Sequence, residues 1–275
     1  MTLANRTVFI TGASRGIGLA IALRAAADGA NVVVAAKTTE PHPRLPGTIF
    51  TAAEAIERAG GQALAVAMDV RDEVQVKAAV KAAVERFGGL DVLVNNASAI
   101  YLTGTLDTPI RRFDLMHQVN ARGTFLTSQH CLPHLRRSAN AHILNIAPPL
   151  NLNPRWFAPH VAYTMAKYGM SLCVLGMAEE FRAQGVAVNA LWPRTAIDTA
   201  AISLIAGEET RRRKTRRAAV MADAAHQVVT RPSRDCTGRF LIDDEVLAEA
   251  GITDLSGYLQ DGAREEDLMP DFFLD

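Results

Sequence analysis

The decisive stretch of this sequence is Thr11-Gly12-Ala13-Ser14-Arg15-Gly16-Ile17-Gly18. A short β-branched run from Thr7 to Ile10 precedes it, and an Ala-rich helical pattern from Gly16 to Asp28 follows it. The three glycines let the chain turn sharply, approach a ligand without a Cβ in the way and pack the helix against its strand. The start of the helix then points free N–H groups at an anion. Strand, turn and helix in this order predict that the stretch binds a nucleotide pyrophosphate, rather than being an ordinary tight turn.

The alternation of strand and helix continues along the chain, which is typical of βα units that build a parallel sheet. The predicted strands are Thr7 to Ile10, Asn31 to Ala35, Gln62 to Met68, Asp91 to Val94, His142 to Ile146, Val186 to Leu191 and Arg239 to Ile242. The predicted helices are Gly16 to Asp28, Thr48 to Ala59, Asp72 to Phe87, Ile110 to Arg137, Tyr163 to Ala183 and Ala222 to Thr230. We therefore expect an α/β Rossmann fold, a doubly wound seven-stranded parallel sheet with helices on both faces.

Length and composition fit one large α/β domain of 275 residues. Lys+Arg and Asp+Glu balance at 29 each, so no net charge attracts nucleic acid or an anionic membrane. No apolar run reaches the ~18 residues of a membrane span, and the first residues lack the pattern of a secretion signal. The three cysteines have neither metal-ligand nor Cys-x-x-Cys spacing. We expect a cytoplasmic protein with buried thiols and no metal site.

Charge is unevenly distributed near the end of the chain. The run from Arg211 to Arg217 carries six cations in seven residues, and the tail from Leu241 to Asp275 carries eleven acids against Arg264. We expect a nucleotide-binding catalytic domain over residues 1–245, with a lid at about 195–217, and an acidic extension over 246–275 packed on the same domain. The cationic run either meets acidic groups of a ligand or forms a basic face paired with the tail.

The end of the second strand decides which nicotinamide cofactor is bound. An Asp or Glu there would hydrogen-bond the ribose 2′-hydroxyl, but the sequence reads Val34-Ala35-Ala36-Lys37. Lys37 and Arg15 could reach a 2′-phosphate, so NADP(H) is predicted over NAD(H); the alternative is that both are solvated surface cations. Asp69-Val70, after the third strand, is predicted to meet the adenine, and a helix N-cap at Asp69 is the alternative.

Tyr163 and Lys167 carry the predicted chemistry. They are four residues apart, so they share one face of a helix. A tyrosine with a pKa near ~10 is a poor base at neutral pH, but a neighbouring ammonium and an oxidised nicotinamide ring would lower that pKa. Tyr163 would then donate a proton to a substrate carbonyl oxygen as hydride arrives, or remove one from an alcohol. Taken alone, the pair would be interpreted as a helix-surface contact.

Further motifs occur in order: Asn95-Asn96-Ala97-Ser98, Val119-Asn120-Ala121 and Tyr163-Thr164-Met165-Ala166-Lys167. With the glycine turn, they resemble the short-chain dehydrogenase/reductase family over about residues 5–245. The resemblance implies that Asn96 and Ala97 lie along the cofactor and that Lys167 also holds the nicotinamide ribose. It implies that the Asn120 amide holds a water linking the lysine to solvent, and that the chain forms a homodimer or homotetramer. Stretches 37–49, 148–154, 162–169 and 266–275 resemble one group of that family more closely.

One departure from the family pattern concerns a serine expected after the fifth strand, about twelve to fourteen residues before the tyrosine. The chain reads Ala147-Pro148-Pro149 after that strand, and no serine occurs between Ser138 and Ser171. Loss of a hydrogen bond to a developing charge would slow turnover by orders of magnitude without abolishing binding. The amide of Asn151 or Asn153 is one predicted replacement, and a turn-stabilising role is the alternative.

The sequence therefore supports two functions. The leading one is an NADP(H)-dependent oxidoreductase acting on a carbonyl or alcohol substrate, with a lipid-like or fatty-acyl substrate implied by the resemblance alone. The rival is a low-turnover NADP(H)-binding protein that senses the cofactor and keeps the fold without the serine. Trp156, Phe157 and Met165 are predicted either to line an apolar pocket or to lie in the core or an interface. Arg194 stands where the family usually has glycine.

Overall fold

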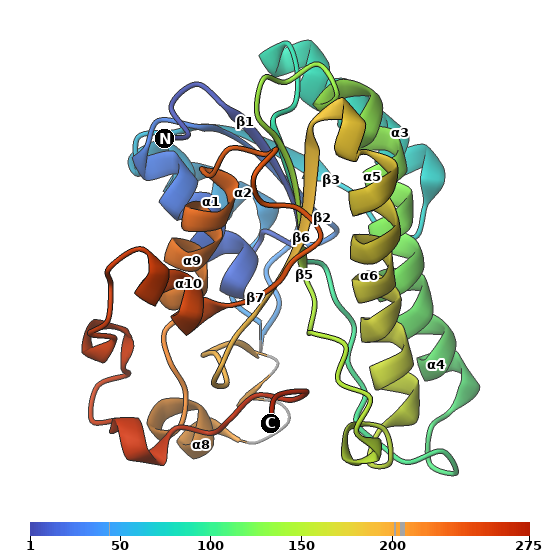
Figure 1. The fold of residues 1–275 in the computed structure, drawn as a ribbon, viewed down its shortest axis with the longest axis vertical. Helices are drawn as coiled ribbons and strands as arrows, with labels where there is room; N and C mark the ends of the chain where they lie inside the picture. Colours follow the sequence, from blue (N-terminus) through green and yellow to red (C-terminus); the bar gives the residue numbers. More distant parts are fainter. Residues whose placement is uncertain (44, 201, 204–206) are drawn as a thin grey trace.

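The computed structural model of the protein describes residues 1–43, 45–200, 202–203 and 207–275. Its centre is a parallel sheet with the strand order β3-β2-β1-β4-β5-β6-β7 (Figure 1). The strands are β1 (Thr7–Thr11), β2 (Asn31–Ala36), β3 (Gln62–Ala67), β4 (Val92–Asn95), β5 (Ala141–Ile146), β6 (Val186–Trp192) and β7 (Phe240–Ile242). The predicted seven-stranded parallel sheet is confirmed, and each boundary lies within one residue of the predicted one.

Helices cover both faces of the sheet, as predicted. They are α1 (Gly16–Ala27), α2 (Ile49–Arg58), α3 (Glu73–Phe87), α4 (Ile110–Met116), the π-helix η1 (His117–Arg122), α5 (Gly123–Leu135), α6 (Val161–Glu180), α8 (Glu208–Arg213), α9 (Ala219–Val229) and α10 (Asp243–Glu249). Short 3-10 turns are η2 (Pro154–Trp156), η3 (Arg182–Gln184), η4 (Ser256–Tyr258) and η5 (Glu265–Asp267). Helices α8 and α10 were not predicted.

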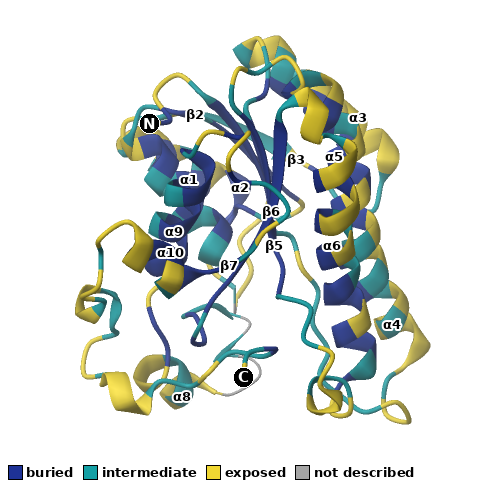
Figure 2. Ribbon diagram, in the orientation of Figure 1, coloured by how far each residue is buried: buried dark blue, intermediate teal, exposed yellow. Residues whose placement is uncertain are grey.

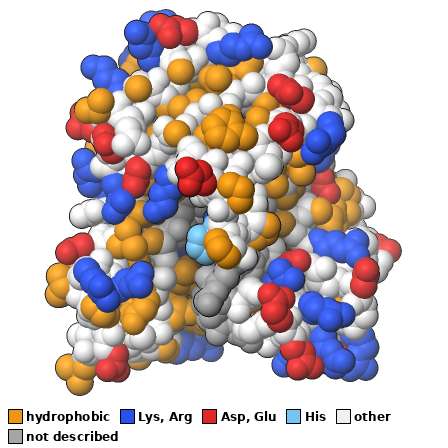
Figure 3. Space-filling view, turned by 180° about the vertical axis from the view of Figure 1, so that it is seen from behind, with side chains coloured by type: hydrophobic (Ala, Val, Ile, Leu, Met, Phe, Trp, Pro, Cys, Tyr) orange, Lys and Arg blue, Asp and Glu red, His pale blue; other side chains and the backbone are white. Residues whose placement is uncertain are grey.

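The two faces form two apolar cores. One lies between the sheet and α1, α2, α9 and α10, and the other between the sheet and α3, α5 and α6. Six of the strands are largely buried, whereas β3 at the edge of the sheet is only partly buried, and most of the helices show an exposed outer face (Figures 1 and 2). Seen from behind, the lower part of the surface is hollowed between two lobes (Figure 3). This arrangement is that of a doubly wound sheet, because its all-parallel strands are shielded from water on both sides.

The predicted single helix from Ile110 to Arg137 is wrong in one respect. The π-turn η1 interrupts it and separates α4 from α5. The Asn120 side chain, fully buried in this turn, accepts a hydrogen bond from the Ala99 N–H (2.7 Å) and donates one to the Ala99 carbonyl (3.0 Å). These two bonds hold the turn against the chain segment that follows β4. A π-turn inside a helix frequently marks a functional site.

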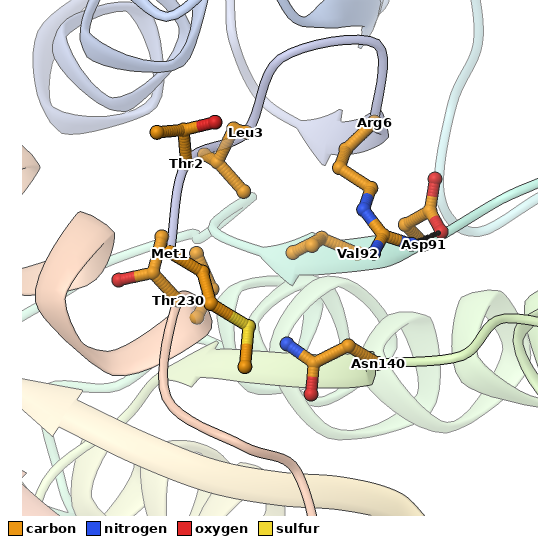
Figure 4. A pocket seen from close by; sticks show the side chains of 9 residues that line it. Met1, Thr2, Leu3, Arg6, Asp91, Val92, Asn140 and Thr230 are labelled. Atoms are coloured by element: carbon orange, nitrogen blue, oxygen red, sulfur yellow. Dashed lines mark hydrogen bonds and ion pairs between the residues drawn. The ribbon is translucent and has the colours of Figure 1, made fainter.

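The sheet order reverses between β1 and β4, which is where ligands bind in doubly wound folds. The glycine turn follows β1 and Asn96 follows β4, so both lie at the carboxyl edge of the sheet. A small pocket lies at the opposite edge and includes Arg6, Asp91 and Asn140 in its lining (Figure 4). Its Arg6–Asp91 ion pair (2.9 Å) ties the start of β1 to the start of β4, so that pocket is structural.

Candidate active site

The glycine turn is built for close backbone approach. Gly12 and Gly16 have φ values of +68° and +59°, a region that residues with a Cβ rarely adopt. A Cβ on Gly12 would lie 3.0 Å from the Cα of Ala97, and one on Gly18 would lie 2.5 Å from the Nδ2 of Asn96. Glycine is therefore required at positions 12 and 18 because the segment after β4 packs directly on the turn.

Thr11 and Asn96 clamp this contact from both sides. The Thr11 hydroxyl accepts hydrogen bonds from the N–H groups of Asn96 and Ala97, each at 3.0 Å. The Asn96 amide donates to the carbonyls of Thr11 (3.0 Å) and Gly12 (3.1 Å). The structure thus brings these predicted residues together, and the Asn96 side chain braces the turn instead of facing outward.

The start of α1 is left open to an anion. Its N-cap, Arg15, makes no side-chain capping bond, and the first turn contains no acid. Ala13 and Ser14 are buried beneath the turn, while Ile17 is partly buried. Uncapped N–H groups and the positive end of the helix dipole favour a phosphate at this point. The turn therefore fits the pyrophosphate of a dinucleotide.

A hollow lies at the end of β2, and it is lined by Arg15, Lys37, Thr38, Thr39, Glu40, Pro41, His42 and Leu45. Lys37 is exposed, whereas Arg15 donates through Nε and Nη2 to the carbonyls of Pro46 and Gly47, each at 2.9 Å. Arg15 is therefore partly committed to its own loop. Lys37 makes no hydrogen bond or ion pair within the part of the chain that the structure describes. Glu40 also lines the hollow, so the hollow contains an acid beside its two cations.

Asp69 is held by its neighbour. The Arg71 guanidinium binds both oxygens of its carboxylate, with the shortest contact at 2.6 Å, and holds the pKa of Asp69 below its usual range. The N-cap alternative for Asp69 is wrong, because Asp72 caps α3 by accepting from the N–H groups of Val74 and Gln75. Val70, the other residue predicted to meet the adenine, is buried and packs against the position of Gly123.

Tyr163 and Lys167 lie on α6 with 4% and 3% of their surfaces exposed. Lys167 Nζ donates to the Ile146 carbonyl at the end of β5 (2.9 Å) and lies 5.1 Å from the centre of the Trp192 ring. Burial lowers the pKa of Lys167 to about 8, against the opposing effect of the Asp271 charge. The ammonium is therefore positioned by a strand carbonyl and an aromatic face.

The pKa of Tyr163 in the free protein is set by its burial; the predicted lowering needs the oxidised nicotinamide ring as well and stays a prediction. Burial, with a smaller contribution from the nearby Asp271 carboxylate, raises the pKa of Tyr163 above its usual value. Both effects disfavour the phenolate. The phenol is therefore protonated at neutral pH in the free protein.

The Asn120 side chain is bonded to the chain segment that follows β4. Its Oδ1 accepts from the Ala99 N–H and its Nδ2 donates to the Ala99 carbonyl, which leaves one amide hydrogen and one lone pair for the expected water. Its π-turn packs tightly against α6, because a Cβ on Gly169 would lie 2.5 Å from the Ala121 Cβ. Asn120 thus fixes the π-turn that supports α6. The turn contacts α6 at Gly169, two residues after Lys167.

The segment after β5, where the family pattern has a serine, is held by local contacts. Ala147 is fully buried, and the Pro148 carbonyl accepts a hydrogen bond from Ser171 (2.7 Å). The Asn151 side chain accepts from the Asn153 N–H (3.0 Å), and the Asn153 side chain caps η2 through the Arg155 N–H (3.1 Å). These contacts are those of the turn-stabilising alternative for Asn151 and Asn153.

The cationic run is largely neutralised. Arg216, buried, pairs with Glu265 of the tail, and Arg217 pairs with Asp261 (2.5 Å). Arg211 lies 3.0 Å from Glu208 and 3.4 Å from Asp198. The ion pairs with the tail favour the basic-face alternative. Residues 201 and 204–206 of the predicted lid lie outside the described residues.

Sequence reasoning missed the approach of the last residues to the catalytic pair. Phe273 is fully buried, and its ring centre lies 6.3 Å from that of Tyr163. Trp156 and Phe157 belong to this aromatic cluster, while Met165 is exposed on α6. Arg194 turns away from the cluster and pairs with Asp244 on α10 (3.0 Å). The Phe-Phe pair within an acidic tail was the available signal.

Neither a metal centre nor a membrane helix is found in the described ranges. No group of three or more His, Cys, Asp or Glu residues there is arranged to hold a metal ion. No helix among those residues is both long and apolar enough to cross a bilayer.

Comparison with known proteins identifies the fold and the motifs. The model of the short chain dehydrogenase family matches residues 6–206, more than half of the chain. The chain belongs to the short-chain dehydrogenase family. Its members are oxidoreductases that bind a nicotinamide cofactor and act on small molecules, and the glycine turn described above fits such a cofactor.

The more specific resemblance is also confirmed. Hydroxysteroid dehydrogenase-like protein 2 of Danio rerio is 60% identical over 273 residues, which cover 99% of this chain and 65% of the relative. The protein of that name from Homo sapiens is 59% identical over 273 residues and is covered to 64%. The chain therefore spans about two thirds of the length of these relatives, or somewhat less.

Solved structures extend the comparison. A chain from Xanthomonas campestris is 61% identical, with a TM-score of 0.96 and full coverage of both chains. A short chain dehydrogenase from Mycobacterium thermoresistibile is 52% identical, with a TM-score of 0.93 over 100% of this chain and 96% of that one. The dehydrogenase fold is thus shared over the whole described chain.

Proposed function

We propose that the protein is an NADP(H)-dependent oxidoreductase that interconverts a carbonyl compound and the corresponding alcohol. The observation that carries this proposal is the placement of Tyr163 and Lys167 on one buried helix face, at the sheet edge that holds the glycine turn. A bound nicotinamide cofactor supplies or accepts the hydride. The chain's own residues have to bind that cofactor, orient the substrate and move one proton.

Tyr163 supplies the proton. Its raised pKa keeps the phenol protonated at neutral pH, which is the state required to donate to a carbonyl oxygen. Lys167, held by the Ile146 carbonyl, keeps a positive charge near the phenol up to about pH 8 and would hold the ribose hydroxyls. That charge favours the phenolate that remains after proton transfer.

The preference for NADP(H) rests on the end of β2. Ala36 ends the strand without a carboxylate, and the exposed Lys37 follows beside the hollow. An ammonium at this position attracts a 2′-phosphate, whereas an acid would repel it. In Lys37→Glu, NADPH affinity should fall about tenfold or more, as expected for a charge-assisted contact. NADH affinity should stay within about twofold. Equal effects on both cofactors would contradict the assignment.

The substrate class rests on the relatives' name and on the aromatic cluster. Hydroxysteroid dehydrogenase-like relatives suggest an apolar alcohol or ketone, and the apolar cluster that contains Tyr163 also includes Trp156, Phe157 and Tyr168. We therefore include lipid-like and fatty-acyl carbonyl compounds among the substrates to be tested. The deciding assay is oxidation of NADPH by the purified protein with aldehydes, ketones, quinones and 3-oxoacyl thioesters.

Tyr163→Phe is the matched control, because it removes one hydroxyl and keeps the ring. Turnover should fall by about 10²–10⁴-fold with cofactor affinity unchanged. The rival function, a low-turnover cofactor sensor, is favoured by the absence of a serine after β5. Tight NADPH binding without turnover in the wild-type protein would support that rival.

Pairing of the chain with itself is part of the proposal. Phe125 on α5 and Met165, Leu172 and Leu175 on α6 are exposed apolar side chains on neighbouring helices. Such a face favours a homodimer or homotetramer through α5 and α6. Sedimentation of the wild-type protein as a monomer at micromolar concentration would contradict this assignment.

A further inference from the structure

Residues Met269–Asp275, which we call the strap, run back beneath the carboxyl edge of the sheet (Figure 1). The strap pairs with the segment that follows β6. The Ala196 N–H donates to the Met269 carbonyl (2.8 Å), and the Asp271 N–H donates to the Arg194 carbonyl (3.0 Å). These two bonds form a short antiparallel ladder, and the Trp192 indole N–H also donates to the carbonyl of Phe272 (2.9 Å). Together these bonds direct the strap toward Tyr163 and Lys167.

Phe273 is the end point of that path. It is fully buried, although it lies in a segment without regular secondary structure. Its ring-centre distances to neighbouring rings are 5.3 Å for Tyr168, 5.9 Å for Trp192, 6.0 Å for Trp156, 6.2 Å for His160 and 6.3 Å for Tyr163. A side chain from the strap therefore fills the space at the catalytic tyrosine.

The docked strap closes the tyrosine to a substrate. With Tyr163 only 4% exposed, a substrate oxygen cannot come within the ~3 Å that proton transfer requires unless a neighbour moves. Trp192 belongs to β6, and Tyr168 to α6, both of which are fixed in the core. The strap is held by a few backbone bonds and aromatic contacts, so it is the neighbour that can leave.

Two features of the strap favour release. Phe273 has a φ of +72°, a left-handed conformation that is strained for a bulky residue and persists only while the surroundings impose it. Asp275 is tied to Arg155 by an ion pair whose side chains are 66% and 52% exposed. Exposed ion pairs of this kind contribute little to stability. The outer end of the strap is thus weakly held.

We propose that the strap is the removable wall of the substrate site, and that Phe273 occupies the place next to Tyr163 that the substrate enters. The part that concerns a substrate rests on the proposed function, whereas the opening of the strap can be tested without any turnover. Removal of the ring should enlarge the site, so Phe273 also limits the size of the group beside the substrate carbonyl.

Hydrogen exchange tests the opening directly. The amides of Ala196 and Asp271, bonded within the ladder, should exchange at least about 100-fold faster than the amides in the middle of β6, because they open locally. Exchange of the ladder amides at the rate of β6, through global unfolding only, would overturn the proposal.

Tryptophan fluorescence gives an independent measure. The chain has two tryptophans, Trp156 and Trp192, and both rings lie beside Phe273. Phe273→Ala should raise the acrylamide quenching constant about twofold or more, whereas Asp275→Ala, which removes only an exposed ion pair, should raise it much less. Phe50→Ala is the control, because Phe50 is 53% exposed on α2 and should leave quenching unchanged. Wild-type quenching in Phe273→Ala would overturn the proposal.

Ketones of increasing length connect the strap to the substrate. With NADPH, Phe273→Ala should lower KM for 2-decanone relative to 2-butanone about fivefold or more, while kcat changes little. If the ratio of the KM values for 2-decanone and 2-butanone does not change, Phe273 does not line the substrate site. If the wild-type protein reduces neither ketone nor any other carbonyl compound, the proposed function fails, and exchange and quenching alone decide whether the strap opens.

Discussion

Gly169 offers a sharp test of how the catalytic helix is positioned. It lies on α6, two residues after Lys167, and an added Cβ would lie 2.5 Å from the Ala121 Cβ in the π-turn beside Asn120. Real Cβ atoms essentially never approach this closely. Gly169→Ala should therefore push α6 away from the turn, because both contacting atoms are fixed to backbone.

The magnitude follows from two opposing effects. Overpacking of this kind costs about 1–3 kcal/mol, while replacing a helical glycine by alanine gains about 1 kcal/mol. Gly176→Ala on the same helix isolates the second effect, because its added Cβ meets nothing within 4 Å. We expect Gly176→Ala to stabilise the protein by up to about 1 kcal/mol, and Gly169→Ala to be about 1–3 kcal/mol less stable than Gly176→Ala.

The assay is urea unfolding, with the free energy of unfolding taken from the midpoint at constant m. Ala121→Gly removes the opposing methyl group, so the double variant Ala121→Gly/Gly169→Ala should recover the clash energy. The cycle should give a favourable coupling of about 1–3 kcal/mol. Equal stabilities for Gly169→Ala and Gly176→Ala, or a coupling below about 0.5 kcal/mol, would refute the close-contact argument.

Three further predictions concern stability. Hydrogen bonds from the Leu3 N–H and His226 outweigh the desolvation of Asp28, so its folded pKa lies below the unfolded value near ~3.9. Asp28→Asn should therefore lower the free energy of unfolding by about 2 kcal/mol at pH 7. In urea titrations, the variant should also lose less stability than the wild type as the pH falls below about 4. Burial lowers the pKa of His142 to about 4. Protonation of His142 should therefore lower the free energy of unfolding of the wild type by about 3 kcal/mol as the pH falls from about 6.5 to about 4. His142→Gln should lack this pH dependence in the same titration. Thr11→Val leaves two N–H groups unpaired and should lower the free energy of unfolding by about 2 kcal/mol, measured against Thr2→Val on the exposed first residues.

The fold could be predicted from the sequence because its signals are local. Buried parallel strands have continuous β-branched runs such as Asn31–Ala36, and the glycine turn is specified within eight residues. The strand boundaries consequently agree within one residue. Helix α10 was missed because its seven residues are too few to show a helical period, and the π-turn was missed because it depends on a bond between Asn120 and Ala99.

The site was predictable only in part, because much of it depends on contacts between residues that are distant in the sequence. Tyr163 and Lys167 share a helix face by spacing alone, but the pKa of each depends on burial by residues distant in sequence. The role of Asn96 also depends on a tertiary contact, because its amide bonds to the turn about 85 residues earlier. Phe273 follows no sequence pattern that indicates burial, and it reaches the site through pairing with a segment about 75 residues earlier.

Burial controls the charge states of Tyr163 and Lys167, the pair proposed to carry the chemistry. The low-dielectric surroundings disfavour both the phenolate of Tyr163 and the ammonium of Lys167, yet the lysine pKa of about 8 still leaves the ammonium dominant at neutral pH. The free protein thus holds a neutral proton donor beside a positive charge, the combination that carbonyl reduction requires. Alcohol oxidation requires the phenolate instead, so a further positive group must act on Tyr163 before that direction becomes favourable. The strap disfavours the phenolate, because the Asp271 carboxylate raises the pKa of Tyr163. Release of the strap would move both this charge and the ring of Phe273 away from Tyr163.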